Sequence, residues 1–292
     1  MRLTECGGPE AAWVVAVPGR PEHRLSNTTW RDSFCMRLAV PLPFLANGPL
    51  GYDCHDAFDW VSREIATSVR VAARRRRTRP PQVDCRGEHD QRCPRASTLS
   101  RHDCVQDVVR AELRYGGKRV KTATVHELRD RSNVDMSKAK GDLRVDNMLA
   151  DGLPMVIDFG ITHSLRDTYV NLPSRRRSVA LVPTSTIGSS SGATTAKDLH
   201  GHLHYRSFTL GTLGSFGASV WGLIDIVCDR NHPHAHDDCC GWRDPDPRRR
   251  FILSVGFALQ RANSRMLRAA HRRRLSARYA GRSSGFDSAR AH

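Results

Sequence analysis

Long apolar runs are missing from this sequence of 292 residues. No window approaches the roughly 18 apolar residues that a membrane helix needs, so we expect no membrane partner. The opening stretch MRLTECGGPEAAWVVAVPG also lacks the sustained apolar core of a secretory signal, because an acidic residue interrupts it. The nine cysteines follow none of the regular frameworks that small secreted domains use, which favours a reducing compartment. We therefore predict a nuclear or cytoplasmic protein.

Acidic residues are scarce relative to basic ones. Asp and Glu number 30 against 46 for Lys and Arg, and the formal net charge of +16 attracts polyanions. Arginine predominates among the basic residues, as phosphate binding favours. Nucleic acid is therefore the first expected partner, with DNA ahead of RNA. A single arginine run is equally typical of a solvated or disordered surface.

Changes of composition suggest how the chain is organised, and its length allows one large or two small domains. We expect an N-terminal helical segment over 1–62, a basic linker over 63–83, a Cys/His segment over 84–100, a folded domain over 101–275 and a disordered basic tail over 276–292. Within the first segment, Trp30, Phe34 and Leu38 predict a short helix that ends at Pro41. The Ser/Gly-rich stretch over 173–206 is interpreted as loop.

Hydrophobic periodicity predicts a helix followed by strands in the folded domain. Apolar residues recur at helical spacing from Val105 to Leu113, and Gly116-Gly117 ends that helix. His102 and Asp103 open it, and Asp103 is interpreted as its N-terminal cap. The stretches KRVKTATVHEL, GDLRVDNML and PMVIDFGITH are candidate strands, with a turn at Asp151-Gly152 between the last two. RSFTLGTLGSFGASVWGLIDIVC predicts a further strand and helix, and RRRFILSVGFALQRANSRMLRAAHRRRL an amphipathic helix with arginine clusters at both ends.

The stretch GDLRVDNMLADGLPMVIDFG allows two different active sites. As a kinase site, which resembles that of aminoglycoside phosphotransferases, Asp142 is the base while Asn147 and Asp158 hold Mg²⁺. As a nuclease site, Asp142 and Asp158 form a carboxylate pair on adjacent strands that grips a divalent ion. The kinase interpretation lacks an upstream nucleotide-covering lobe, and the His that usually precedes its Gly-Asp is Lys140.

Six motifs occur in an order that resembles the C-terminal region of non-LTR-type retrotransposon polyproteins: HRLSNTTWRDSFCMRLAVPLPF, GEHDQRC, SRHDCVQDVV, GDLRV…MVIDFGITH, LGTLGSFG and LSVGFALQRANSRMLR. The similarity covers about residues 11–50 and 84–275. In that family a Cys/His knuckle and a restriction-enzyme-like endonuclease follow a reverse transcriptase. This chain has no Tyr/Phe-x-Asp-Asp box, so the reverse transcriptase domain of the parent element is not part of it.

The resemblance implies an α/β (α+β) fold, a small mixed sheet flanked by helices as in restriction endonucleases. It implies that Asp142 and Asp158 are catalytic and hold Mg²⁺ or Mn²⁺. Glu112, on the preceding helix, is a candidate third acid, with a solvated helix carboxylate as the alternative. Related nucleases carry a Lys two residues after the second acid, where this chain has Gly160. That departure, with the inserted segments, also fits a decayed copy that binds nucleic acid without cleaving it.

The resemblance also implies a zinc knuckle, with Cys85, His89 and Cys93 as ligands and Cys54 as the remaining candidate. Free thiols in a loop are the alternative. The tract HPHAHDDCC over 232–240 has no counterpart in the family and is interpreted as loop. Basic residues expected to bind nucleic acid are Arg74, Arg75, Arg76, Arg77, Lys138, Lys140, Arg272, Arg273 and Arg274.

Strand geometry places a condition on the nuclease interpretation. With a two-residue turn at Asp151-Gly152, Asp142 and Asp158 would face opposite sides of the hairpin. A three-residue loop or a bulge is therefore required to bring the two carboxylates to one side. Without it, Asp142 is a strand-edge residue and Asp158 a solvated strand end.

Overall fold

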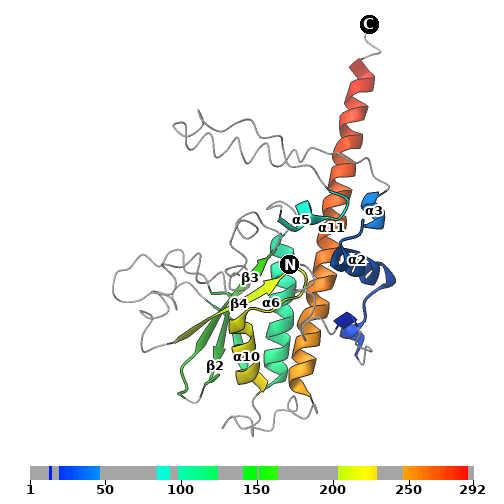
Figure 1. Cartoon of the computed structure of the whole chain (residues 1–292). Helices are drawn as coiled ribbons and strands as arrows, with labels where there is room; N and C mark the ends of the chain where they lie inside the picture. The colour runs from blue at the N-terminus through cyan, green and yellow to red at the C-terminus, as the bar shows by residue number, and fades with distance from the viewer. Residues whose placement is uncertain are drawn as a thin grey trace, which may run out of the picture. The chain divides into compact units, whose positions relative to one another are not determined.

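The computed structural model describes residues 13–14, 20–46, 84–92, 98–123, 141–149, 151–163, 203–228 and 246–288. Their contacts divide the chain into two compact units. Unit 1 comprises residues 1–25 and 99–262, and unit 2 comprises 26–98 and 263–292. One long helix, α11 (Pro247–Ser288), contributes to both (Figure 1). No helix among the described residues is long and apolar enough to cross a membrane.

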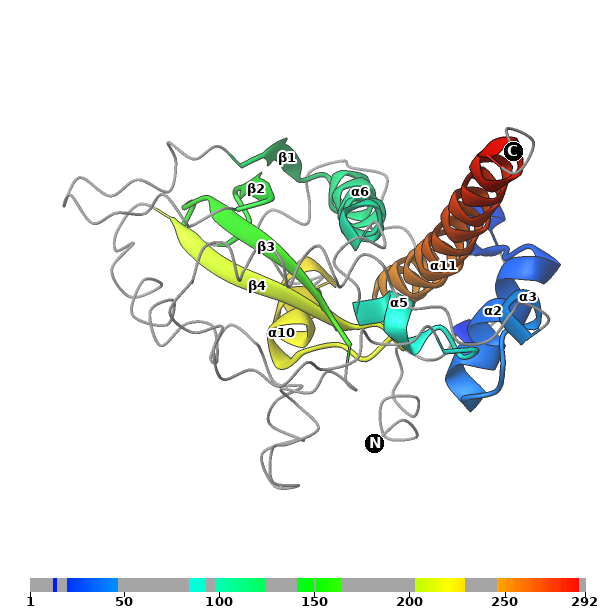
Figure 2. The same cartoon turned by 90° about the horizontal axis from the view of Figure 1, so that it is seen from above.

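Unit 1 is built on a mixed four-stranded sheet in the order β1-β2-β3-β4 (Figure 2). The strands are β1 (Arg119–Thr122), β2 (Leu143–Asp146), β3 (Met155–Thr162) and β4 (His204–Gly211). The pairs β1–β2 and β2–β3 are antiparallel, whereas β3–β4 is parallel. With the helices described next, this confirms the expected α/β class and its small mixed sheet.

Three helices share one apolar core with the sheet: α6 (Thr98–Tyr115), α10 (Ala218–Cys228) and the first part of α11. Side chains point alternately to the two faces of a strand, and on β3 Met155, Ile157 and Phe159 contribute to the core. The ring of Phe159 packs against that of Phe208 of β4 at a tilt of 40°, and Phe208 in turn contacts Phe251 of α11. This face is therefore closed to water, and the alternate residues of β3 lie on the other face.

Helix α6 follows the predicted periodicity but begins earlier than expected. Val105, Val109 and Leu113 are fully buried at a spacing of four residues, and the chain leaves the helix at Gly117 with φ 77°. The helix starts at Thr98 rather than at His102. Asp103 is therefore not the N-terminal cap, and it lies in the second turn instead.

Unit 2 contains α2 (Asn27–Leu38), α3 (Pro43–Ala46), α5 (Glu88–Arg92) and the second part of α11. Helix α2 is capped by Ser26, whose hydroxyl accepts from the Thr29 N–H at 3.1 Å, and it ends at Ala39 with φ 59°. The prediction of a short helix before Pro41 is thus confirmed. Asp32 fixes α2 to α11, because its buried carboxylate accepts from Ser264 and from both Nε and Nη2 of Arg268.

The helical C-terminus differs from the tail expected over 276–292, since α11 continues to Ser288. Within α11 the only proline is Pro247, at the first helical position, where it causes no break. Alanine and arginine, both favourable in helices, are frequent after residue 270. The expected linker over 63–83 and most of the Ser/Gly-rich stretch lie outside the described residues.

Candidate active site at the start of strand β2

The backbone of Asp142 is held from three sides, just before β2 begins. Its N–H donates to the Ile157 carbonyl of β3 at 2.9 Å. Its carbonyl accepts from the Ala123 N–H after β1 at 3.2 Å and from Nε2 of Gln106 on α6 at 3.1 Å. The position of this carboxylate is therefore set by two strands and a helix rather than by a loose loop.

The β2–β3 register has the even parity that the nuclease interpretation requires, but the regular ladder stops before it reaches Asp142. Leu143 pairs with Ile157 and Val145 with Met155, so the paired numbers have an even sum as far as Leu143, the residue next to Asp142. The ladder is irregular at that point. Ile157, already the partner of Leu143, also accepts from the Asp142 N–H, so two residues of one strand oppose one residue of the other. The connection between β2 and β3 is longer than a two-residue turn, and the bulge lies at the end of the hairpin away from this connection.

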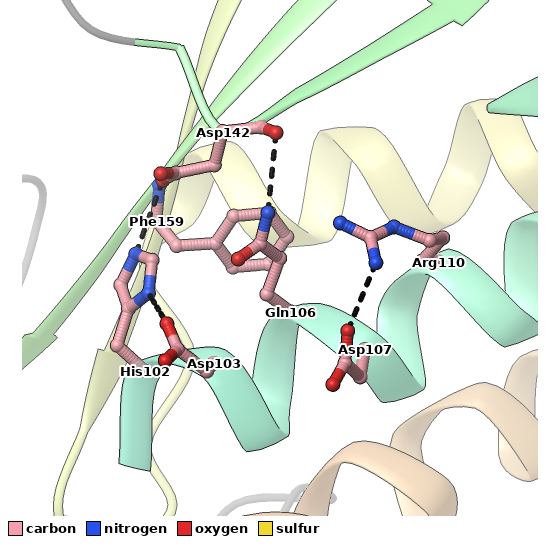
Figure 3. Close-up of polar contacts among 7 residues, drawn as sticks. All are labelled: His102, Asp103, Gln106, Asp107, Arg110, Asp142 and Phe159. Carbon is pink, nitrogen blue, oxygen red and sulfur yellow. Dashed lines mark hydrogen bonds and ion pairs between the residues drawn. The ribbon is translucent and has the colours of Figure 1, made fainter. Parts of the chain in front are cut away.

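His102 of α6 reaches the carboxylate of Asp142 (Figure 3). Its Nε2 lies 3.1 Å from Asp142 Oδ2, and its Nδ1 lies 3.1 Å from Asp103 Oδ1. The Phe159 N–H donates to the same Oδ2 at 2.7 Å. The ring of His102 meets that of Phe159 edge-on at 6.0 Å between centroids. Chiefly through the hydrogen bond to Asp142, the pKa of His102 is raised to about 9, so the ring is a cation at neutral pH.

Asp158 lies on β3 beside Phe159, on the face of the sheet away from the core. It is half-buried and pairs in register with Ser207 of β4. Burial, and then the negative charge of Asp142, raise the pKa of Asp158 to about 6, while a hydrogen bond from the Tyr205 side chain opposes the shift. The two carboxylates are thus close enough to repel one another, and a cation between them would relieve that repulsion.

Glu112 is not brought to this pair. It follows His102 by ten residues on α6, which is about 15 Å along a helix. Its Oε2 accepts from Arg250 Nε at 2.8 Å, and its Oε1 accepts from Ser254 Oγ at 2.7 Å. Because the Arg250 side chain is only 5% exposed and that of Glu112 11%, this is a buried ion pair between α6 and α11. Glu112 holds two helices together, and its expected role as a third acid has no support in this geometry.

Asn147 is also remote from the pair. It follows β2 with φ 55°, at the end of the strand opposite to Asp142. The five residues of extended chain from Asp142 to Asn147 span about 17 Å, so Asn147 lies far from Asp142 along β2. The kinase interpretation requires Asn147 to converge with Asp158 on one ion, and the hairpin separates them.

Gly160 occupies the position of the lysine found in related nucleases, on the same face of β3 as Asp158. A Cβ placed there would meet Thr209 Oγ1 at 3.9 Å, an ordinary contact, and no closer described atom. The fold therefore has room for a Cβ at this position.

The Cys/His segment is partly described. Asp84 caps α5, with Oδ1 accepting from the Glu88 N–H and Oδ2 from the His89 N–H. Cys85 is a free thiol. His89 is 8% exposed, and its buried Nε2 has no hydrogen-bond partner among the described residues. Cys54 and Cys93 lie outside the described residues, and the described part of the chain holds no cluster of three metal-ligating side chains.

The basic residues expected to bind nucleic acid divide into two groups. Arg272 and Arg273 are exposed on α11. Arg274 is instead bound internally, since its guanidinium donates to Asp90, which is fully buried, with Nη1 at 2.9 Å from Oδ2. We correct the expectation for Arg274, because a buried carboxylate requires a partner. The remaining candidates, Arg74, Arg75, Arg76, Arg77, Lys138 and Lys140, lie outside the described residues, as does the tract over 232–240.

His102 is the residue that sequence reasoning missed. The sequence pattern indicates only a helix start at His102, although His102 and Gln106 are four residues apart and so share one face of α6. Both reach Asp142. The polar pair of His102 and Gln106 beside the apolar stripe of α6 indicates a polar contact on this face. The sequence of α6 alone does not show that the contact is with Asp142.

In metal-free buffer, we expect the His102 ring to titrate near pH 9. The pKa of His102 in the folded protein lies above its ordinary value of 6.5. The protonated ring therefore contributes its full stabilisation of the fold below pH 6.5, and this stabilisation is lost as the pH rises toward 9. This contribution is at most about 3 kcal/mol. NMR of the ring nitrogens in wild type and Asp142→Asn provides the measurement. A wild-type ring that titrates near 6.5 would contradict the prediction.

Comparison with known proteins adds no relative, because no protein-family model matches the chain and no curated protein matches it significantly. The function is therefore inferred from the geometry of Asp142, Asp158 and His102.

Proposed function

We propose that the chain is a metal-dependent DNA endonuclease of the restriction-enzyme-like type, derived from a retroelement. The observation that carries the proposal is the carboxylate pair, in which the charge of Asp142 helps to raise the pKa of Asp158. The mixed sheet with α6 against it is compatible with that nuclease fold. By the same resemblance, the reverse transcriptase domain of a parent element is the expected protein partner.

The donor atoms fit a hard divalent cation. No hydrogen bond among the described residues uses Oδ1 of Asp142, since both neighbours bind Oδ2. Mg²⁺ in phosphate-processing sites commonly takes one or two carboxylates and keeps several waters, so a site without a third protein ligand is adequate. Asp142 and Asp158 would hold Mg²⁺ or Mn²⁺, which would lower the pKa of a bound water and stabilise charge on the phosphate.

The surrounding residues orient the pair. His102 and the Phe159 N–H fix Oδ2 of Asp142, which leaves the other oxygen of this carboxylate for an ion. The Tyr205 side chain hydrogen-bonds to Asp158 and steadies the second carboxylate. The net charge of +16 supplies the attraction for a polyanionic substrate.

Supercoiled plasmid incubated with Mg²⁺ or Mn²⁺ tests this function. We expect the wild type to nick it, and EDTA to prevent nicking. Wild type that binds the plasmid but never nicks it would favour the second candidate, a non-catalytic nucleic-acid-binding remnant, which the glycine at position 160 supports. Gly160→Lys then separates a missing lysine from a missing metal site, because a Cβ at this position makes only an ordinary contact. Gain of nicking by Gly160→Lys would indicate that only the lysine is missing.

We also propose a zinc site in the Cys/His segment, with Cys85, His89 and Cys93 as ligands and Cys54 as the fourth candidate. The buried, unpartnered Nε2 of His89 supports it, because such an atom is costly unless something binds it. Purified protein should contain about one equivalent of zinc, and His89→Gln and Cys93→Ala should lose it. Cys35→Ala, a free thiol of the same unit, is the control. A metal-free, folded wild type would exclude the site.

A further inference from the structure

Positive charge predominates on the surface of unit 2 where its side chains are described. Of its described acidic residues, Asp32 and Asp90 are fully buried and bind Arg268 and Arg274, and Asp84 and Glu88 are half-buried. Among residues of this unit with described side chains, each exposed charged residue is an arginine: Arg31, Arg86, Arg265, Arg272 and Arg273. Such a surface attracts polyanions at close range.

Helix α2 presents aromatic rings on the same surface. Trp30 is 43% exposed and stacks on Phe34, with the ring centroids 4.9 Å apart and the planes 10° from parallel. Leu38, four residues further on, is 53% exposed and continues the stripe. The opposite side of α2 is buried through Asp32 and Met36. The helix thus directs two stacked rings away from the interior of its own unit.

The rings are held by a rigid attachment. The carboxylate of Asp32 accepts from Ser264 at 2.7 Å and from Arg268 at 2.6 and 2.9 Å, and Arg268 also covers the ring of Phe44. Because the buried face of α2 is tied to α11 in this way, its outer face is presented in a fixed orientation. Phe34 covers one face of the indole, so a flat ligand can extend the stack on the other.

We propose that α2 binds single-stranded nucleic acid, with an unpaired base stacked on the Trp30 indole and phosphates bound by exposed arginines of the same unit, of which Arg31 is adjacent to Trp30 in sequence. Base–aromatic stacking beside a basic surface is the usual way in which proteins bind single strands without sequence preference. The bases of a duplex are already stacked on each other and offer no free face. The site requires no metal ion and is independent of the carboxylate pair.

The occupant is nucleic acid rather than protein because of charge. A protein partner or a second copy would use the apolar stripe of Trp30, Phe34 and Leu38 but would bring no phosphates for the arginines. A second copy would carry the same arginine-rich surface, and its approach would be opposed by like charges.

Fluorescence anisotropy with a labelled oligo(dT) strand tests the proposal. Measurements use the full chain with Asp158→Ala as background and without added Mg²⁺ or Mn²⁺, so that the result is independent of cleavage and any bound zinc is retained. We expect Trp30→Ala to weaken binding of the single strand by about tenfold or more, and Trp30→Phe to retain most of the affinity. Leu38→Ala, on the same stripe but without a ring, is the matched control and should bind as wild type does. Binding of a duplex of equal length should be unchanged in all variants.

Trp30→Leu keeps an apolar side chain but removes the ring. If Trp30→Ala loses helicity, Trp30→Leu replaces it in the comparison. Equal affinity of wild type, Trp30→Leu and Trp30→Phe for the single strand would overturn the proposal. Self-association of the wild type, measured by sedimentation, would also overturn the proposal if Trp30→Leu and Leu38→Ala both abolished it while oligo(dT) binding stayed unaffected. That result would assign the stripe of Trp30, Phe34 and Leu38 to contact with a second copy. Failure of the wild type to nick plasmid would contradict the role of the carboxylate pair alone and would leave this proposal for α2 unaffected.

Discussion

Asp158→Ala is expected to lower the rate of plasmid nicking by roughly 100-fold or more in Mg²⁺, because it removes one of the two carboxylates proposed to hold the ion. DNA affinity should be unchanged or slightly higher, since the substitution also removes a negative charge from a surface that meets phosphate. The pair is electrostatically coupled, because the charge of Asp142 helps to raise the pKa of Asp158. Nicking rates at saturating protein, with binding measured separately, give the two quantities.

The matched control is Asp151→Ala, an acid in the connection between the same two strands. Asp151 is exposed, binds His204 and the Leu153 N–H, and lies at the other end of the hairpin from Asp158. Its substitution should leave nicking within about twofold of wild type, as is usual for an exposed site away from the chemistry. Equal losses in both variants would indicate a general effect of charge, and undiminished nicking by Asp158→Ala would refute the proposed site.

Glu112→Ala is expected to lower the free energy of unfolding by about 3 to 5 kcal/mol, because it leaves the buried guanidinium of Arg250 without its carboxylate. The Arg250 side chain is only 5% exposed, and its Nε donates to Glu112 at 2.8 Å. The ring of Tyr115 lies 4.0 Å from this guanidinium and retains part of the stabilisation. Ser254 also loses an acceptor. Thermal and urea unfolding followed by circular dichroism measure the change.

Asp107→Ala is the control on the same helix. Asp107 is 67% exposed and pairs with Arg110, so its removal should cost less than about 1 kcal/mol. A second variant, Glu112→Gln, keeps the shape and separates structure from catalysis. If it retains divalent-ion affinity and nicking, Glu112 is structural, whereas loss of ion affinity in a stable Glu112→Gln would restore it as a third acid.

Local pattern was sufficient for the elements that position the site. The four-residue spacing of Val105, Val109 and Leu113 predicted α6, because one face of a helix must be apolar to pack on a sheet. The apolar stretch before Asp158 predicted β3, where Met155, Val156 and Ile157 are all fully buried. Pro41 correctly placed the limit of α2, which ends at Leu38. These features depend on residues close in the chain.

The partners of the charged groups were decided only by tertiary structure. Sequence separation hides the meeting of His102 with Asp142, 40 residues apart, and of Arg274 with Asp90, 184 apart. Glu112 is an acid on the predicted helix, yet the rise of the helix carries it away from Asp142 and onto Arg250. A side chain's type states what it can bind, whereas the packing of helices and strands determines which partner lies within a few ångströms and how much water is removed. The sequence by itself therefore determined the helices, the strands and the two acids, and the tertiary structure decided which charges are buried in pairs and which carboxylates are left to act together.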